Sequence, residues 1–251
     1  ALAACGSGSG GGGESGPVVP PPTGGGDAAS ATALNIVITG VNISSPPVVT
    51  FNVTDQAGVG VPNLAAADLR FNIAKLMPGS NGAPTTWQNY INRAVNGAVQ
   101  GSQERSAAGF AYGTLVNRGN GTFIYTFATD IKGGVNACPA PCTDADGRPL
   151  DLSYQPDLTH RVTVQQANRA YPNASGTYDF VPAGGGTVTR RDVVATATCN
   201  GCHNELSAHD TRVDTKLCDT CHNPGSSVAG TPRTTVDFKV MIHRIHYNAA
   251  G

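Results

Sequence analysis

Hydrophobic and polar residues alternate along much of the chain between about residues 34 and 181. Within residues 69–76, for example, Leu69, Phe71 and Ile73 alternate with polar residues, and a period of two places successive side chains on opposite faces of a strand. The other alternating or β-branched runs are residues 34–43, 48–55, 110–129, 159–167 and 176–181. Segments rich in glycine, proline and asparagine separate these runs, which is typical of short antiparallel strands.

Residues 110–129 predict a hairpin, because two β-rich arms flank the turn-forming residues 117–121. With these two arms the pattern predicts about seven strands and a mainly β chain, in which residues 31–190 form an antiparallel β-sandwich or split barrel. Helical signal is weak in this domain, and its best candidate lies near Thr85–Asn92.

No catalytic constellation stands out in residues 34–185. The region holds one isolated histidine, His160, and the single tryptophan, Trp87. Each is interpreted as a packing or surface residue, since isolated residues of these types seldom form a site.

Residues 1–30 have the composition of an anchor and a tether. The stretch Ala1–Ser7, ALAACGS, resembles a bacterial lipobox in which Cys5 carries the lipid, and residues 6–30 are rich in Gly, Ser and Pro. A lipid on Cys5 would hold a folded body beside a membrane. The alternatives are an incidental Ala-rich start with a free thiol, and a tail without a role.

Charge and hydropathy limit the kinds of partner that this chain can bind. The formal net charge of −1 provides no basic surface for nucleic acid. No apolar run approaches the length of a spanning helix, so the expected membrane attachment is by lipid only.

Cys138 and Cys142 lie four residues apart, outside every other motif. Such a pair predicts a small disulfide loop, which persists in an oxidising compartment. Pro139 and Pro141 restrict its geometry, and a redox-active pair is the less favoured interpretation.

The composition changes sharply near residue 190. Five of the six histidines and four of the seven cysteines lie between Cys199 and His246. The chemistry of this chain is therefore expected in residues 191–251.

Two Cys-x-x-Cys pairs, Cys199/Cys202 and Cys218/Cys221, are separated by fifteen residues. That spacing suits a four-thiolate zinc site, and the same thiols could hold an iron–sulfur cluster. However, a histidine follows each pair directly, His203 and His222. Cys-x-x-Cys-His is the attachment site of c-type haem, in which the histidine is an axial iron ligand, so two haems are the favoured interpretation.

Three further histidines, His209, His243 and His246, are candidates for the opposite axial positions. His243 and His246 are spaced i, i+3 in VDFKVMIHRIHYN, close to one face of a predicted helix. Which of the three meets which iron stays open. Imidazole on both faces of an iron leaves no open position for a substrate, which favours electron transfer over catalysis.

Three segments carry a family resemblance: YDFVPAGG, then RRDVVATATCNGCHNELSAHDTRVDTKLCDTCHNPGSS, and TVDFKVMIHRIHYNAAG. Over about residues 176–251 the chain resembles the outer-membrane decahaem c-type cytochromes of the OmcA/MtrC family. The resemblance implies a β domain followed by a haem-packed, mostly irregular and helical domain with bis-histidine irons. It assigns Cys199, Cys202 and His203 to one haem c, and Cys218, Cys221 and His222 to the next.

The resemblance also implies a lipid-anchored protein on the extracellular side of an outer membrane. Its expected partners are other multihaem cytochromes or a porin–cytochrome conduit, and its expected acceptors are metal oxides, metal complexes or flavins. Because family members continue with further haem motifs, this chain is expected to be part of a longer protein. Two alternatives are a multihaem reductase with one open haem, and a zinc-ribbon module on a β domain.

Overall fold

The computed structural model describes part of the N-terminal segment and nearly all of the remainder of the chain. The described residues are 14–15, 20–79, 82–134, 138, 140 and 142–249. The predicted lipid-bearing Cys5 lies outside them, as does part of the tether.

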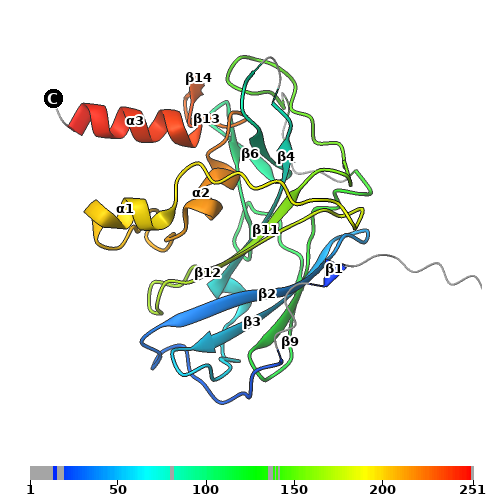
Figure 1. Ribbon diagram of the computed structural model, residues 1–251, viewed down its shortest axis with the longest axis vertical. Helices are drawn as coiled ribbons and strands as arrows, with labels where there is room; N and C mark the ends of the chain where they lie inside the picture. The colour runs from blue at the N-terminus through cyan, green and yellow to red at the C-terminus, as the bar shows by residue number, and fades with distance from the viewer. Residues whose placement is uncertain are drawn as a thin grey trace, which may run out of the picture.

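Two antiparallel sheets form the larger part of the molecule (Figure 1). The first sheet contains, in spatial order, β1 (Glu14–Ser15), β2 (Leu34–Asn42), β3 (Val48–Asp55), β10 (Thr122–Thr126) and β9 (Thr114–Asn117). The second sheet contains β12 (Ser175–Phe180), β11 (His160–Gln166), β4 (Leu69–Met77) and β5 (Thr86–Asn89), and β8 (Glu104–Arg105) also pairs with β4. The predicted sandwich and the β9–β10 hairpin are confirmed.

Apolar side chains from both sheets fill the space between them. Phe71 of β4 stacks on Tyr125 of β10 with ring centroids 3.6 Å apart, and Phe51 of β3 lies 5.4 Å from Phe123. Aromatic rings bury large areas and dominate core energetics. The core members from the predicted alternating runs include Ile36, Ile38, Val49, Leu69, Ile73, Val162, Val164 and Phe180.

The prediction of a helix near Thr85–Asn92 is wrong. Residues Thr86–Asn89 form β5, which pairs with β4 in the register Leu76↔Trp87 and Ala74↔Asn89. Tertiary pairing overrides a weak local preference here, because Trp87 buries its ring against Ala74 and Leu76. His160 is also a packing residue, fully buried between Tyr90 Oη and the carbonyl oxygen of Leu158.

Several short elements gave no clear signal in the sequence. They are the hairpin β6 (Asn92–Val95) with β7 (Ala98–Gly101), the hairpin β13 (Ser227–Val228) with β14 (Thr231–Thr235), and a 3-10 turn at Ala66–Asp68. Cys138 and Cys142 are joined by a disulfide with a Cα–Cα distance of 5.7 Å and pack against the core.

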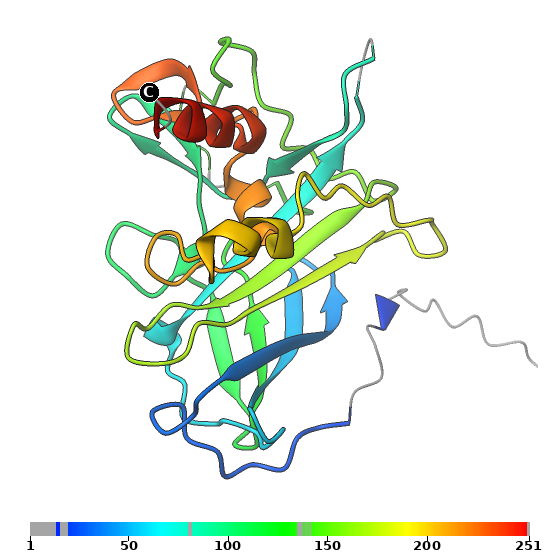
Figure 2. The ribbon, with the colours of Figure 1, turned by 60° about the vertical axis from the view of Figure 1, so that its left-hand side comes forward.

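Three helices follow the sandwich: α1 (Thr196–His203), α2 (Thr215–Cys221) and α3 (Phe238–Ala249). Figure 2 shows α1 and α2 in front of the long strands of the second sheet, with α3 beside them. Among the described residues, none of the helices has the length and hydrophobicity that a membrane-spanning helix requires.

The second sheet is buried on both faces. Its inner face contributes Phe71, Ile73 and their neighbours to the sandwich core, whereas its outer face carries polar side chains that are also buried. This outer face packs against the segment that contains α2. Its principal hydrogen bonds join Asn72 to Thr220, Gln165 to Thr211 and Thr177 to Asp214.

Arg161 is the central anchor of this outer face. Its side chain is fully buried, donates two hydrogen bonds to Asp179 at 2.7 and 2.8 Å, and lies 4.1 Å from the centroid of the Trp87 ring. It also donates to the carbonyl oxygen of Lys216 in α2 and lies 3.5 Å from Asp192. One guanidinium group therefore joins the sheet, the segment that leads to α1, and α2.

We expect Arg161→Ala to lower the free energy of unfolding by about 3–5 kcal/mol, because it leaves the half-buried Asp179 carboxylate without its partner. Urea denaturation followed by circular dichroism measures this change. Arg118→Ala, at an exposed turn position, is the matched control and should stay within about 0.5 kcal/mol of the wild type. A loss below 1 kcal/mol at Arg161 would show that the anchor is dispensable.

Asp219 of α2 lies in the same interface and is only 3% exposed. Burial raises its pKa to about 7, although Arg161 and Arg191 oppose the increase. Its Oδ1 atom has no hydrogen-bond partner, which suits the protonated form. A carboxyl whose pKa is higher in the folded state contributes stability that is complete at low pH and is lost as the pH rises through the folded-state pKa.

We therefore expect the free energy of unfolding to decrease by about 2 kcal/mol between pH 5.5 and pH 8 on account of Asp219, at roughly 1.4 kcal/mol per pH unit within its titration range. Asp219→Asn should flatten this slope, and Asp157→Asn, at an exposed loop position, should preserve it. Denaturant titrations at several pH values provide the measurement. An unchanged slope in Asp219→Asn would assign the pH dependence to other groups.

Candidate functional site

All the predicted haem residues line one cavity of about 950 Å³ between the three helices. Both cysteine pairs, His203 and His222, and the three further histidines border this space. Apolar residues complete its walls, principally Val193, Val194, Leu217, Phe238, Met241 and Ile242. A large, mostly apolar cavity with convergent sulfur and imidazole groups is the kind of space that a porphyrin requires.

The second motif is held firmly by the β-sandwich. Asp214 caps α2 by accepting a hydrogen bond from the backbone N–H of Lys216. The helical spacing then places Cys218 and Cys221 on one face, and both are buried. Asn72 Nδ2 donates to Cys221 Sγ at 3.3 Å, so a strand of the second sheet contacts the motif directly.

Burial also sets the protonation of these two thiols. It raises the pKa of Cys218 to about 12 and raises the pKa of Cys221 as well. Both thiols are therefore neutral in this environment. Among the residues that the structure describes, no three His, Cys, Asp or Glu side chains gather as a metal site, so the four cysteines do not form the tetrahedral cluster of a zinc ribbon.

The first motif lies further from the sheet. In α1, Cys199 is half-buried, and Cys202 and His203 are exposed. Thr196 ties the start of this helix to α2, because its hydroxyl contacts the Asp214 carboxylate and the Thr215 hydroxyl. Because Cys202 and His203 are exposed, one side of the first motif is open to solvent.

The histidines form two facing pairs. The ring centroids of His209 and His222 are 5.9 Å apart, and those of His203 and His246 are 6.0 Å apart. Imidazole–metal bonds of about 2 Å place two imidazoles on opposite sides of one metal ion with their centroids roughly 6 Å apart. Each motif histidine therefore faces a second histidine at a separation that can accommodate an iron. Within the described part of the chain, His243 has no such partner.

Backbone carbonyl groups orient the rings. The Nδ1–H groups of His222, His243 and His246 donate to the carbonyl oxygens of Val236, Lys239 and Ile242 at 3.3, 2.6 and 2.9 Å. This arrangement leaves each Nε2 lone pair free, as metal-binding histidines require. Burial lowers the pKa of His222 to about 4 and also lowers that of His209, so both imidazoles are neutral at pH 7.

A tight turn positions His209. His209 and Asp210 have φ values of 48° and 74°, and Ala208 and Arg212 exchange two backbone hydrogen bonds across the turn. The side-chain hydroxyl of Ser207 closes it by donating to the carbonyl oxygen of Asp210. The turn brings His209, six positions after the last residue of the first motif, to a ring-centroid distance of 5.9 Å from His222 of the second.

Sequence reasoning missed the β-domain residues around the second motif. Asn72, Asn89 and Ser102 contact Cys221 Sγ from three strands or loops, and Arg70, Arg93 and Arg105 lie nearby. One signal for these contacts was present in the sequence. The alternation in residues 69–76 places the polar residues Arg70 and Asn72 on the outer face of the predicted strand.

A model of the family described as outer membrane cytochrome MtrC/MtrF-like, domains II/IV, matches residues 191–251. A curated relative, the multiheme cytochrome MtrC of Shewanella baltica (strain OS185), is 28% identical over 213 residues, which cover 80% of this chain and 28% of the relative.

Two crystal structures are similar to the whole fold. The decaheme cytochrome OmcA has a TM-score of 0.65 at 24% identity, over 88% of this chain and 34% of that chain. MtrC from Shewanella baltica OS185 has a TM-score of 0.60 at 26% identity, over 86% and 33%. The likeness to OmcA is one of fold, and the chain spans about a third or less of the length of these relatives. The fold, the match over residues 191–251 and the MtrC relative agree, and the chain is similar to the OmcA/MtrC family of multihaem outer-membrane cytochromes.

Proposed function

We propose that this chain binds two c-type haems and carries electrons through them. The observation that supports this most directly is the pair of facing histidines at each Cys-x-x-Cys-His motif, in one apolar cavity. Cys199 and Cys202 would attach the first haem, and Cys218 and Cys221 the second. His203 and His246 would hold the first iron, and His222 and His209 the second.

The residues present fit a haem in kind as well as in position. At the second motif, the buried thiols of Cys218 and Cys221 lie where thioether bonds would form, and the His222 imidazole, whose Nδ1–H donates to the carbonyl oxygen of Val236, suits iron ligation. Haem iron with imidazole on both faces supplies a one-electron couple and has no open position for a substrate. The protein's own contribution is to hold the rings, exclude water and set the polarity around the sulfurs.

The two proposed haem sites differ in how closely they pack against the β domain. Cys218 and Cys221 lie against the second sheet, whereas α1 and the histidines of α3 are largely exposed. A more buried haem is more strongly influenced by protein dipoles, so the two haems should differ in reduction potential. Because both motif histidines face another imidazole, the proposal favours electron transfer over a reductase with an open iron.

The wider role is extracellular electron transfer in a longer multihaem protein. The named relatives are the multiheme cytochrome MtrC and the outer membrane decaheme cytochrome OmcA. Both are about three times as long as the region that matches this chain. His243 would then serve a further haem that is attached elsewhere in that protein. Cys5 would carry a lipid on the extracellular side, and partner cytochromes or a porin conduit would supply the electrons.

Removal of one motif should remove one haem. We expect Cys218→Ser/Cys221→Ser, matured by a c-type assembly system, to retain one covalent haem where the wild-type chain has two. Pyridine haemochrome absorbance per protein, with intact mass, provides the count. Cys138→Ser/Cys142→Ser is the matched control, since it also removes two sulfurs, and it should keep both haems. Colourless wild-type protein would exclude the proposal.

The histidine pairing predicts which substitution shifts a potential. His246→Met should raise the midpoint potential of one haem by on the order of 100 mV, because a Met/His pair gives a higher potential than two histidines. His243→Met, three residues away on the same helix, should leave both potentials of this chain unchanged. Spectroelectrochemical titration measures both variants. The reverse result would assign His243, and not His246, to the first iron.

A further inference from the structure

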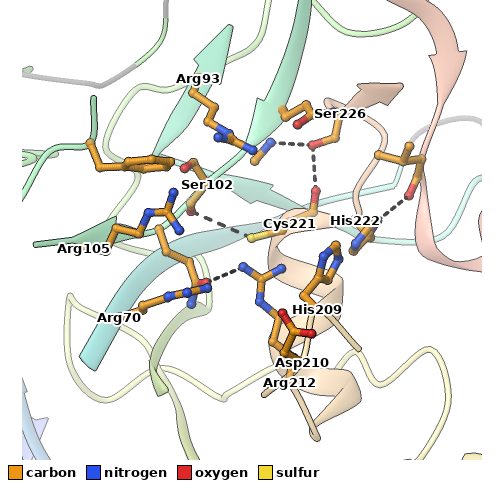
Figure 3. A pocket seen from close by; sticks show the side chains of 15 residues that line it. Arg70, Arg93, Ser102, Arg105, His209, Asp210, Arg212, Cys221, His222 and Ser226 are labelled. Atoms are coloured by element: carbon orange, nitrogen blue, oxygen red, sulfur yellow. Dashed lines mark hydrogen bonds between the residues drawn. The ribbon is translucent and has the colours of Figure 1, made fainter. Parts of the chain in front are cut away.

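His209 differs from its partner His222 in how it is held. The His222 ring is fixed by a hydrogen bond from its Nδ1–H to the carbonyl oxygen of Val236. Among the hydrogen bonds of the described residues, none involves the ring of His209, and this residue is exposed. Figure 3 shows the two rings side by side, with Asp210 and Arg212 next to His209. The position of the His209 imidazole therefore depends on the backbone of its turn.

This turn needs contacts from outside itself. His209 and Asp210 have φ values of 48° and 74°, so two successive residues with side chains lie in the left-handed region. That conformation is energetically costly for residues other than glycine, and it persists where surrounding contacts hold it. The hydrogen bonds between Ala208 and Arg212 and from Ser207 to Asp210 close the turn but do not attach it to the sheet.

Gln165 of β11 provides that attachment. It is fully buried; its Nε2 donates to the Thr211 hydroxyl at 2.8 Å, and its Oε1 accepts from Nε of Arg212 at 3.4 Å. Thr211 is only 2% exposed, and Arg212 also donates to Gln103 at 2.8 Å. Gln165 therefore holds the two residues that directly follow the left-handed pair.

A second contact to the turn is weaker. Arg169, in the loop after β11, forms an ion pair with Asp210. The exposed fractions of the two side chains are 74% and 53%, and ion pairs at such exposed positions contribute little to stability. The buried hydrogen bonds of Gln165 are the stronger restraint, because a buried amide that loses its partners is costly.

The same pair of strands also holds the second haem motif. Asn72 of β4 donates to Cys221 Sγ at 3.3 Å. Thr163 of β11 is the cross-strand partner of Asn72, and Gln165 lies two residues further along β11. Asn72 and Gln165 are therefore diagonal neighbours on the outer face of the sheet. The pairing of β4 with β11 thus relates the position of the motif to that of the turn.

We propose that Gln165 is the positioning residue for His209: it holds the turn that presents this imidazole to the second iron, and so keeps that iron closed to outside ligands. The proposal rests on the proposed function, because it requires a haem at the second motif with His209 as an axial ligand. Gln165 acts through Thr211 and Arg212. A residue of the β domain thereby determines the coordination state of the second haem.

The first test is the spin state of iron in Gln165→Leu holoprotein. Leucine removes both hydrogen bonds and leaves the turn free to move away. The ferric wild type should be low-spin by electron paramagnetic resonance, whereas the variant should show a high-spin signal. The ferrous variant should bind carbon monoxide at one haem at least about tenfold faster than the wild type. Added imidazole should restore the low-spin spectrum, because it occupies the axial position that His209 leaves.

Two controls separate positioning from general stability. Gln165→Glu should stay low-spin, because its carboxylate can accept from the Thr211 hydroxyl and from Arg212. Asn52→Leu removes a buried amide from the first sheet, where its partner is Thr122, and should also stay low-spin. A high-spin signal in Asn52→Leu would show that any loosening of the sandwich opens the iron, and would overturn the proposal.

Thr211→Val tests the same contact from the turn, and serves if Gln165→Leu does not fold. It should give a smaller high-spin signal, because the contact between Gln165 and Arg212 remains. Unchanged spectra and carbon monoxide rates in whichever of the two variants folds would overturn the positioning role. His209→Ala distinguishes this failure from that of the proposed function: it should be high-spin, and a low-spin His209→Ala would show that His209 is not a ligand of the second iron.

Discussion

The structure depends on a sheet that is buried on both of its faces. The inner face of β4 and β11 completes an aromatic and aliphatic core, and the outer face supports the cysteine- and histidine-rich segment. Burying a polar outer face costs folding free energy unless each polar group forms a hydrogen bond or an ion pair. Arg161 meets that requirement most fully, since it satisfies Asp179, approaches Asp192 and donates to the backbone of α2.

This arrangement explains why the β-sandwich is more than a spacer. It supplies Asn72, Asn89 and Ser102 around Cys221 Sγ, and Arg70, Arg93 and Arg105 beside them. The polarity around a thioether sulfur and the charge near a haem both influence its reduction potential. The sandwich is therefore part of the environment of the second motif, while the first motif, on α1, is in closer contact with solvent and α3.

Charge is distributed unevenly around the two motifs. The half-buried Arg70 and Arg105 and the exposed Arg93 line the β-domain side of Cys221, whereas the helical cavity is walled mainly by apolar side chains. The overall net charge of −1 conceals this separation. An apolar space suits a porphyrin, and the arginines lie at its edge, beside Cys221.

The sequence alone determined the class of fold and predicted the chemistry. Cys-x-x-Cys-His is a local motif whose residues are adjacent in the chain, and alternation in runs such as residues 69–76 reveals strands because its period is also local. The weak helical signal at Thr85–Asn92 failed because pairing of Trp87 with Leu76 decides that segment. Only the tertiary structure paired His209 with His222 and His203 with His246, and gathered Arg70, Arg93, Arg105 and Arg212. These groups come from distant parts of the chain, and their proximity is set by how the sheet and helices pack, which no local pattern encodes.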